Sequence, residues 1–214
     1  MLARYGQLFQ LPSAVAKDAD SEVLQDLLRR RKQVVDQRVQ EGHRLDKGLT
    51  EGARTSTQRH IQWLDKEISR LDDEYRKALE NSTRLAAAAL YRSVPGVGER
   101  TAATLVGYLP ELGQCTGKEL TALVGLAPWS NDSGRQQGYR SIRGGRGAVR
   151  RVLYLSALAA IRSNNDLRRF YQGLRNRGKT GKVALVAVMR KLLLLLNAIA
   201  HRGMPWVEHH APAG

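Results

Sequence analysis

A long polar loop holds the residues of this 214-residue chain whose types could do chemistry. Over residues 129–147 the sequence reads WSNDSGRQQGYRSIRGGRG, with five glycines, four arginines and almost no apolar side chain. A hydroxyl can attack a phosphodiester where arginines neutralise the non-bridging oxygens and a flexible backbone lets the nucleophile come in line. Ser133, between Asp132 and Gly134 and followed by Arg135, fits that requirement best. The simpler interpretation is that Ser133 is a polar turn residue and nothing more.

The arginines in and after this loop are the candidates for binding phosphate. They are Arg135, Arg140, Arg143, Arg146, Arg150 and Arg151. Residues 1–127 contain 19 Lys and Arg against 17 Asp and Glu, whereas residues 128–214 contain 16 against 3, a net charge of +13. Cations that neutralise phosphates release condensed counterions, so this asymmetry predicts a nucleic-acid partner. The alternatives are a basic surface that only keeps the chain soluble, or association with the ribosome.

A second candidate for phosphate binding is the glycine turn SVPGVG at residues 93–98. It stands between two helical patterns and matches the turn of helix-hairpin-helix modules. In those modules glycines let the backbone approach a phosphate, and the next helix offers free N–H groups at its positive end. Gly96 and Gly98 are the predicted contacts. A Pro-Gly turn that merely joins two helices is the alternative.

Several other classes of site do not fit the residues present. The basic half offers only Asp132, Asp166 and Glu208 as carboxylates, too few for a two-metal nuclease. The run RGKTGK at 177–182 lacks the upstream glycine of an ATP-binding loop. Zinc-ligand spacing and a Ser/His/Asp arrangement are also absent from the sequence. We therefore expect no cofactor bound by this chain itself.

The cellular setting follows from the cysteine count and the apolar runs. Cys115 is the single cysteine, which excludes an intramolecular disulfide and fits a reducing cytoplasm. The most apolar run, residues 183–200, is interrupted by Arg190 and Lys191 and is short for a membrane span. The N-terminus lacks the apolar core of a signal peptide. We expect a cytoplasmic protein without a membrane partner.

Hydrophobic periodicity predicts that helices position these residues. Residues 1–20 have no clear pattern and are expected to be a lead-in, and residues 205–214 a tail. Residues 21–84 form an arm of two amphipathic helices, the second with a stripe from Ile61 to Leu79 and a Gly/Thr-rich stretch between them. Either an antiparallel hairpin or a dimerising coiled coil fits. Residues 85–204 form a basic helical domain, so the predicted fold class is mainly α.

Five motifs together resemble one known family. They are SVPGVG at 93–98, LPELG at 109–113, GLAP at 125–128, SG at 133–134 and KVALVAVMRKL at 182–192. Their order and spacing resemble the C-terminal transposase domain of the insertion-sequence 110/116/902 family. The arm, with RHI at 59–61 and LDKEI at 64–68, is similar to the coiled-coil segment of that family. The resemblance covers essentially the whole chain.

The resemblance implies a DNA recombinase directed by a structured guide RNA. In that family a RuvC-like domain supplies four acids for Mg²⁺, and the C-terminal domain supplies a serine that becomes joined to DNA. Ser133 matches this serine by its place after the GLAP motif. Residues 2–6 resemble the segment that follows the last acids, so we expect the RuvC-like half to be missing and the chain alone to be inactive. The expected partners are DNA, guide RNA and a second copy bound through the arm. A non-enzymatic nucleic-acid-binding remnant is the alternative.

Overall fold

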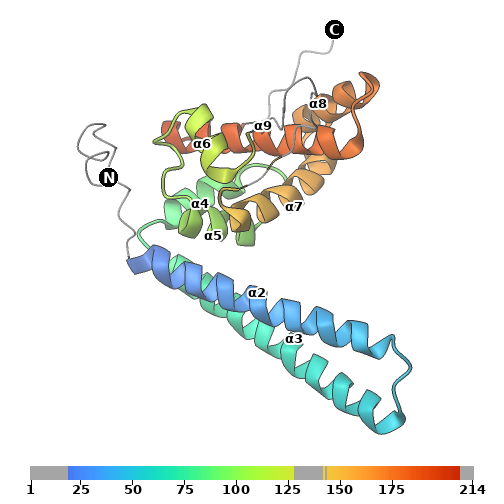
Figure 1. Ribbon diagram of the computed structural model, residues 1–214. Helices are drawn as coiled ribbons and strands as arrows, with labels where there is room; N and C mark the ends of the chain where they lie inside the picture. Colours follow the sequence, from blue (N-terminus) through green and yellow to red (C-terminus); the bar gives the residue numbers. More distant parts are fainter. Residues whose placement is uncertain (1–18, 128–141, 143, 208–214) are drawn as a thin grey trace, which may run out of the picture.

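The computed structural model describes residues 19–127, 142 and 144–207, and within these ranges the regular structure is entirely helical (Figure 1). This confirms the mainly α fold class. The arm consists of α2 (Ala19–Leu45) and α3 (Glu51–Glu80). The domain consists of α4 (Leu85–Arg92), α5 (Glu99–Tyr108), α6 (Gly117–Val124), α7 (Gly147–Ser163), α8 (Asn165–Asn176) and α9 (Gly181–Arg202).

The arm is an antiparallel hairpin that buries the apolar stripes of its two helices against each other. Leu64 and Leu71 of α3 are buried with Val34 of α2. Arg31 of α2 adds a bidentate ion pair, with N–O distances of 2.5 and 2.8 Å to the Asp72 carboxylate. The hairpin therefore uses within one chain the stripe that a coiled-coil dimer would need, and association between copies stays a prediction.

The second arm helix begins ten residues earlier than its apolar stripe indicates. We expected a weakened pattern from the Gly/Thr-rich stretch before Ile61, but α3 begins at Glu51 and the connection between the helices spans only residues 46–50. The side chains of its first ten residues are mostly exposed, so no apolar periodicity marks them. Gly42 and Gly52 lie inside helices, and Gly48, with a φ of +66°, makes the turn.

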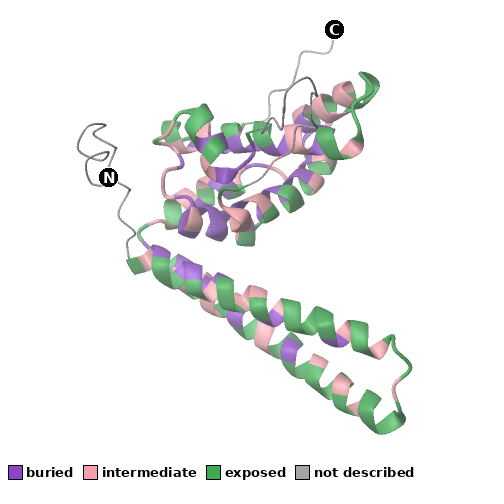
Figure 2. Cartoon of the chain, in the orientation of Figure 1, coloured by how far each residue is buried: buried purple, intermediate pink, exposed green. Residues whose placement is uncertain are grey.

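The core of the domain is built on α5 and α9. Seven consecutive residues of α5, 101–107, are buried, because this short helix is covered by α2, α4 and α7. Helix α9 packs on α7, α8, α4 and α6. It is the one described helix long and apolar enough to span a membrane, but its buried side chains lie in the domain core, which explains its composition. Figure 2 shows buried residues concentrated in the domain and at the root of the arm.

The root of the arm is fixed to the domain by hydrogen bonds and shared core. Gln25 of α2 donates from Nε2 to the Gly107 carbonyl at 2.5 Å, and the Tyr108 hydroxyl donates to the Gln25 carbonyl at 2.9 Å. Leu24 belongs to the same buried cluster as α5 and α9. The distal half of the arm extends away from the domain (Figure 1). The α2 side chains that follow Gln25 are thereby held beside α5 and α7, with which they line a groove.

Candidate nucleic-acid interface

The base of the polar loop is closed by glycines at its two ends. Helix α6 stops at Gly125, whose φ is +76°, and the chain reaches α7 through Gly144 and Gly145, with φ of +70° and +61°. A Cβ on Gly145 would lie 2.5 Å from the Gly125 nitrogen, and the Arg146 N–H donates to the Leu123 carbonyl at 3.0 Å. The loop therefore leaves and returns at one place, beside the start of α7.

Arg146 fastens this base to the end of α5. Its guanidinium donates two hydrogen bonds of 2.5 Å to the Glu111 carboxylate and one of 2.9 Å to the Tyr108 carbonyl. These bonds hold the pKa of Glu111 below its usual range, against the opposing effect of burial. The charge of Arg146 is thus neutralised inside the protein, and its predicted contact with phosphate would have to displace Glu111.

Arg150 and Arg151 are adjacent in α7 but have different surroundings. Arg150 donates from Nη1 to the carbonyls of Val124, at 2.8 Å, and Gly144. Carbonyl oxygens satisfy its donors without cancelling its charge. Arg151 is exposed and forms no ion pair with any residue that the structure describes. Of the predicted arginines within the described ranges, Arg151 is the most available to a phosphate.

The glycine turn joins α4 and α5, and packing accounts for its first glycine. Gly96 has a φ of +97°, and a Cβ there would lie 2.5 Å from the Ala160 nitrogen of α7. Gly98 precedes α5 with a φ of −83° and open space around it. Glu99 occupies the first turn of α5 and forms a 3.0 Å ion pair with Arg76. The turn thus has a structural role, and its contact with phosphate stays a prediction.

The predicted nucleophile and three of the predicted arginines belong to the polar loop. Ser133, Arg135, Arg140 and Arg143 lie outside the described residues. The structure describes the closed base of the loop, the start of α7, and two grooves on either side of the exposed face of α7.

The first groove, of about 260 Å³, lies between α2 of the arm and helices α5 and α7. Five cations line it: Arg29, Arg31, Lys32, Arg100 and Arg151. The three from the arm are paired with Asp26, Asp72 and Asp36. Arg100 is exposed, with no ion pair among the residues described. This groove has a positive rim, but more than half of its cations are compensated.

The second groove, of about 450 Å³, lies between α7 and α9 and is bordered by Ile142 at the loop base. Arg150, Arg151 and Lys182 line it, and no carboxylate does. The sequence did not predict that Lys182 lines this groove or that Glu111 is the partner of Arg146. Lys182 and Arg150, like Glu111 and Arg146, are more than 30 positions apart, and no local pattern marks either pairing.

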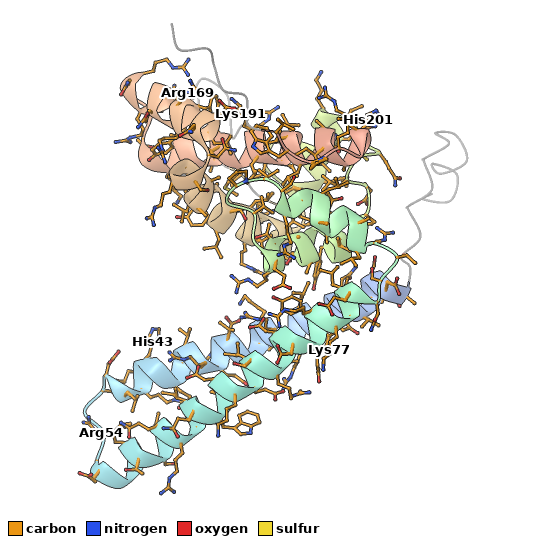
Figure 3. All side chains as sticks on the ribbon, turned by 180° about the vertical axis from the view of Figure 1, so that it is seen from behind. His43, Arg54, Lys77, Arg169, Lys191 and His201 are labelled. Atoms are coloured by element: carbon orange, nitrogen blue, oxygen red, sulfur yellow. The ribbon has the colours of Figure 1, made fainter. Side chains whose placement is uncertain are left out.

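Positive charge predominates over α8 and α9. Described residues 144–207 include 13 Lys and Arg and one acid, Asp166. Arg169 pairs with that acid at 2.8 Å, and Lys191 lies 4.5 Å from the centre of the Phe170 ring. Figure 3 shows both cations on the side of the domain remote from the arm. A surface of this kind attracts a polyanion.

Comparison with known proteins shows that this chain is similar to transposase-family proteins. Residues 88–172 match a model described as the Transposase IS116/IS110/IS902 family. The chain is 34% identical over 148 residues to the Insertion element IS110 uncharacterized 43.6 kDa protein of Streptomyces coelicolor, covering 66% of this chain and 36% of that protein. It is 26% identical over 211 residues to the Pilin gene-inverting protein of Moraxella lacunata, covering 96% and 65%. The chain thus spans between about a third and two thirds of these relatives.

Proposed function

We propose that this chain, whose residues 88–172 match the model of the IS116/IS110/IS902 transposase family, acts in a DNA transposase or site-specific recombinase. Its substrate would be DNA, with a structured guide RNA directing it. The observation that carries this proposal is the concentration of 13 cations against one acid in described residues 144–207. A relative named for inverting a pilin gene supports rearrangement of DNA as the outcome.

Ser133 is the nucleophile in this proposal. Its Oγ would form an ester bond to a backbone phosphorus while a sugar hydroxyl leaves, and Arg135, Arg140 and Arg143 would stabilise the added charge at phosphorus. Arg146 and Arg150 would act indirectly, because they fasten the base from which the loop extends.

The described residues do not fit a magnesium site. They contain no group of three or more His, Cys, Asp or Glu side chains that could hold a metal ion. The family resemblance implies Mg²⁺ bound by acids of a RuvC-like domain. A serine hydroxyl needs a base or a metal to take its proton near neutral pH. That group is expected from outside the described residues.

The same observation keeps a second candidate function, a nucleic-acid-binding protein without catalysis. In that case the basic helices bind phosphates and Ser133 reacts with nothing. The two functions differ in one measurable product, a covalent bond between protein and DNA.

The deciding experiment traps that bond. The chain is incubated with a RuvC-like domain, Mg²⁺, guide RNA and labelled DNA, then run on a denaturing gel. We expect an adduct that Ser133→Ala abolishes and that Ser130→Ala and Ser141→Ala retain. Affinity for DNA should stay within a few-fold in Ser133→Ala, because a loop hydroxyl adds little to contacts dominated by phosphate charge. We expect the chain alone to form no adduct.

An adduct that survives Ser133→Ala but is lost in Tyr139→Phe would identify a different nucleophile. Complete absence of an adduct, with DNA binding intact, would favour the non-catalytic function.

A further inference from the structure

We infer that the groove between α7 and α9 is a subsite for an unstacked base and its phosphates, in single-stranded DNA or RNA. This inference rests on the proposed function, because it assumes that the domain binds nucleic acid. It specifies that the bound nucleic acid is single-stranded, and that both α7 and α9 contribute side chains that contact it.

Two helical stripes form the walls. On α7 the lining residues include Arg150 and Tyr154, which are four apart and share a face, with Arg151 beside them. On α9 they are Lys182, Val186 and Met189, at steps of four and three. The helices pack directly on each other below the groove. The walls are therefore fixed by the domain core and need no rearrangement to present these side chains.

The charge of the groove suits phosphate. Arg151 and Lys182 are exposed and have no ion pair with any described residue, and Arg150 adds a third positive charge. The groove between α2 and α7 differs, because three of its five cations are paired with aspartates. A phosphate binds more tightly where no carboxylate competes with it for the cations.

The remaining lining suits a base. Tyr154 is 44% exposed and Leu155 is 49% exposed, although both lie on a core helix. On the opposite wall the apolar lining is the partly buried Val186, together with Met189, which is 2% exposed. Aromatic side chains beside a positive groove are how proteins hold single strands, since any base can stack on the ring. A base within a duplex is already stacked and cannot offer its face without being extruded.

The size of the groove points the same way. About 450 Å³ is in the range of pockets that enclose a small organic molecule, so the groove takes a nucleotide-sized group and not a duplex. Its edge at Ile142 and Gly147 adjoins the base of the loop that carries Ser133. A strand bound here would lie beside the base of that loop.

The first test measures binding of the full chain to labelled oligo(dT), oligo(rU) and a DNA duplex of equal length. Tyr154→Ala should weaken binding of the single strands by about 5- to 100-fold and leave duplex binding within about twofold. Tyr154→Phe should keep single-strand binding, because it keeps the ring. Trp63→Ala, which removes an exposed aromatic from the arm, is the matched control and should change neither. The DNA and RNA arms show which strand the groove prefers.

The cations have a matched pair of their own. Lys182→Ala should weaken single-strand binding several-fold, whereas Lys179→Ala, three residues earlier and outside the groove, should have less effect. Equal losses from the two variants would mean a general effect of charge and would overturn the subsite.

The second test locates the base directly. Oligonucleotides containing 5-iodouracil are crosslinked to the chain by ultraviolet light, and tryptic peptides are mapped. We expect the crosslink in peptide 152–162, in which Tyr154 is the single aromatic residue. Binding without that crosslink, or a Tyr154→Ala variant that binds like wild type, would overturn the subsite and leave the proposed function standing. Absence of binding to every probe by the wild-type chain would overturn both.

Discussion

Arg146 and Arg150 lie in the most basic stretch of the chain, yet both are bonded to the protein itself. Arg146 is bidentate to Glu111, and Arg150 bonds to two carbonyls across the loop base. A planar guanidinium holds its five donors in a rigid fork that can bind a carboxylate with two hydrogen bonds, whereas a lysine ammonium is a point charge on a flexible stem. We interpret these two arginines as fasteners of the loop, and Arg151 and Lys182 as the cations left for phosphate.

The Glu111–Arg146 pair predicts a dependence of stability on pH. Hydrogen bonds from Arg146 are the main cause that lowers the pKa of Glu111, so the folded state favours the ionised carboxylate. This stabilisation is present above the ordinary pKa of about 4.5 and is lost as pH falls through the lower folded value. Glu111→Gln should cost about 1 kcal/mol at pH 7 and reduce the loss of stability on acidification.

Urea unfolding between pH 7 and 3 measures this effect, with the exposed Glu80→Gln as control. If the wild-type chain and Glu111→Gln lose stability in parallel as the pH falls, the ion pair has no such role.

At the level of elements, the turn between α4 and α5 packs its first glycine against α7. Sequence motif and structure agree on helix, tight turn and helix at this place. They differ at Gly96: the motif predicts that a phosphate contacts this glycine, whereas in the structure the backbone of Ala160 packs against it. Gly98 is free of such contacts, so the two glycines can be tested separately.

Gly96→Ala should destabilise the domain by about 1–3 kcal/mol, because its φ of +97° is unfavourable for alanine and the new Cβ would meet the backbone of α7. Gly98→Ala should change stability by about 0.5 kcal/mol or less, since its φ is ordinary and its surroundings are open. Urea denaturation measures both. If the turn also binds phosphate, Gly98→Ala should lower DNA affinity while the fold remains intact; unchanged affinity would leave the turn with its packing role alone.

Sequence periodicity predicted the helices because most of them bury one face. It failed at the start of α3, where side chains are exposed and no stripe exists. It left the arm open between hairpin and dimer, because an apolar stripe specifies burial but not the partner. For the site, composition predicted that phosphate would be bound in this half. It did not predict which arginines were already engaged, since Glu111 and Arg146 are 35 residues apart and meet only through the tertiary fold.

In the whole molecule, the arm and the domain differ in their balance of charge. Residues 21–84 of the arm contain 14 Lys and Arg against 12 Asp and Glu, and many of these charges pair within the hairpin. The described part of the domain after the loop contains 13 cations and a single acid. Hydrogen bonds join the root of the arm to α5, so the arm is held in a fixed position relative to the domain and its positive surface. We therefore expect the domain, and not the arm, to attract nucleic acid.

This distribution predicts that the affinity of the full chain for DNA falls steeply with salt. If six to ten phosphates are contacted, affinity should drop by about 10³- to 10⁵-fold between 50 and 200 mM salt, because each contact releases counterions. Arg151→Glu and Lys182→Glu should each reduce the slope of log affinity against log salt by about one or more. Arg29→Glu, in the arm beside Asp26, should leave the slope nearly unchanged. Arg146→Glu is unsuitable as a binding variant, since it would place a second carboxylate against Glu111 and unfold the loop base.

Fluorescence anisotropy across a salt series measures these slopes, and a flat titration of the wild-type chain would contradict phosphate binding by this surface.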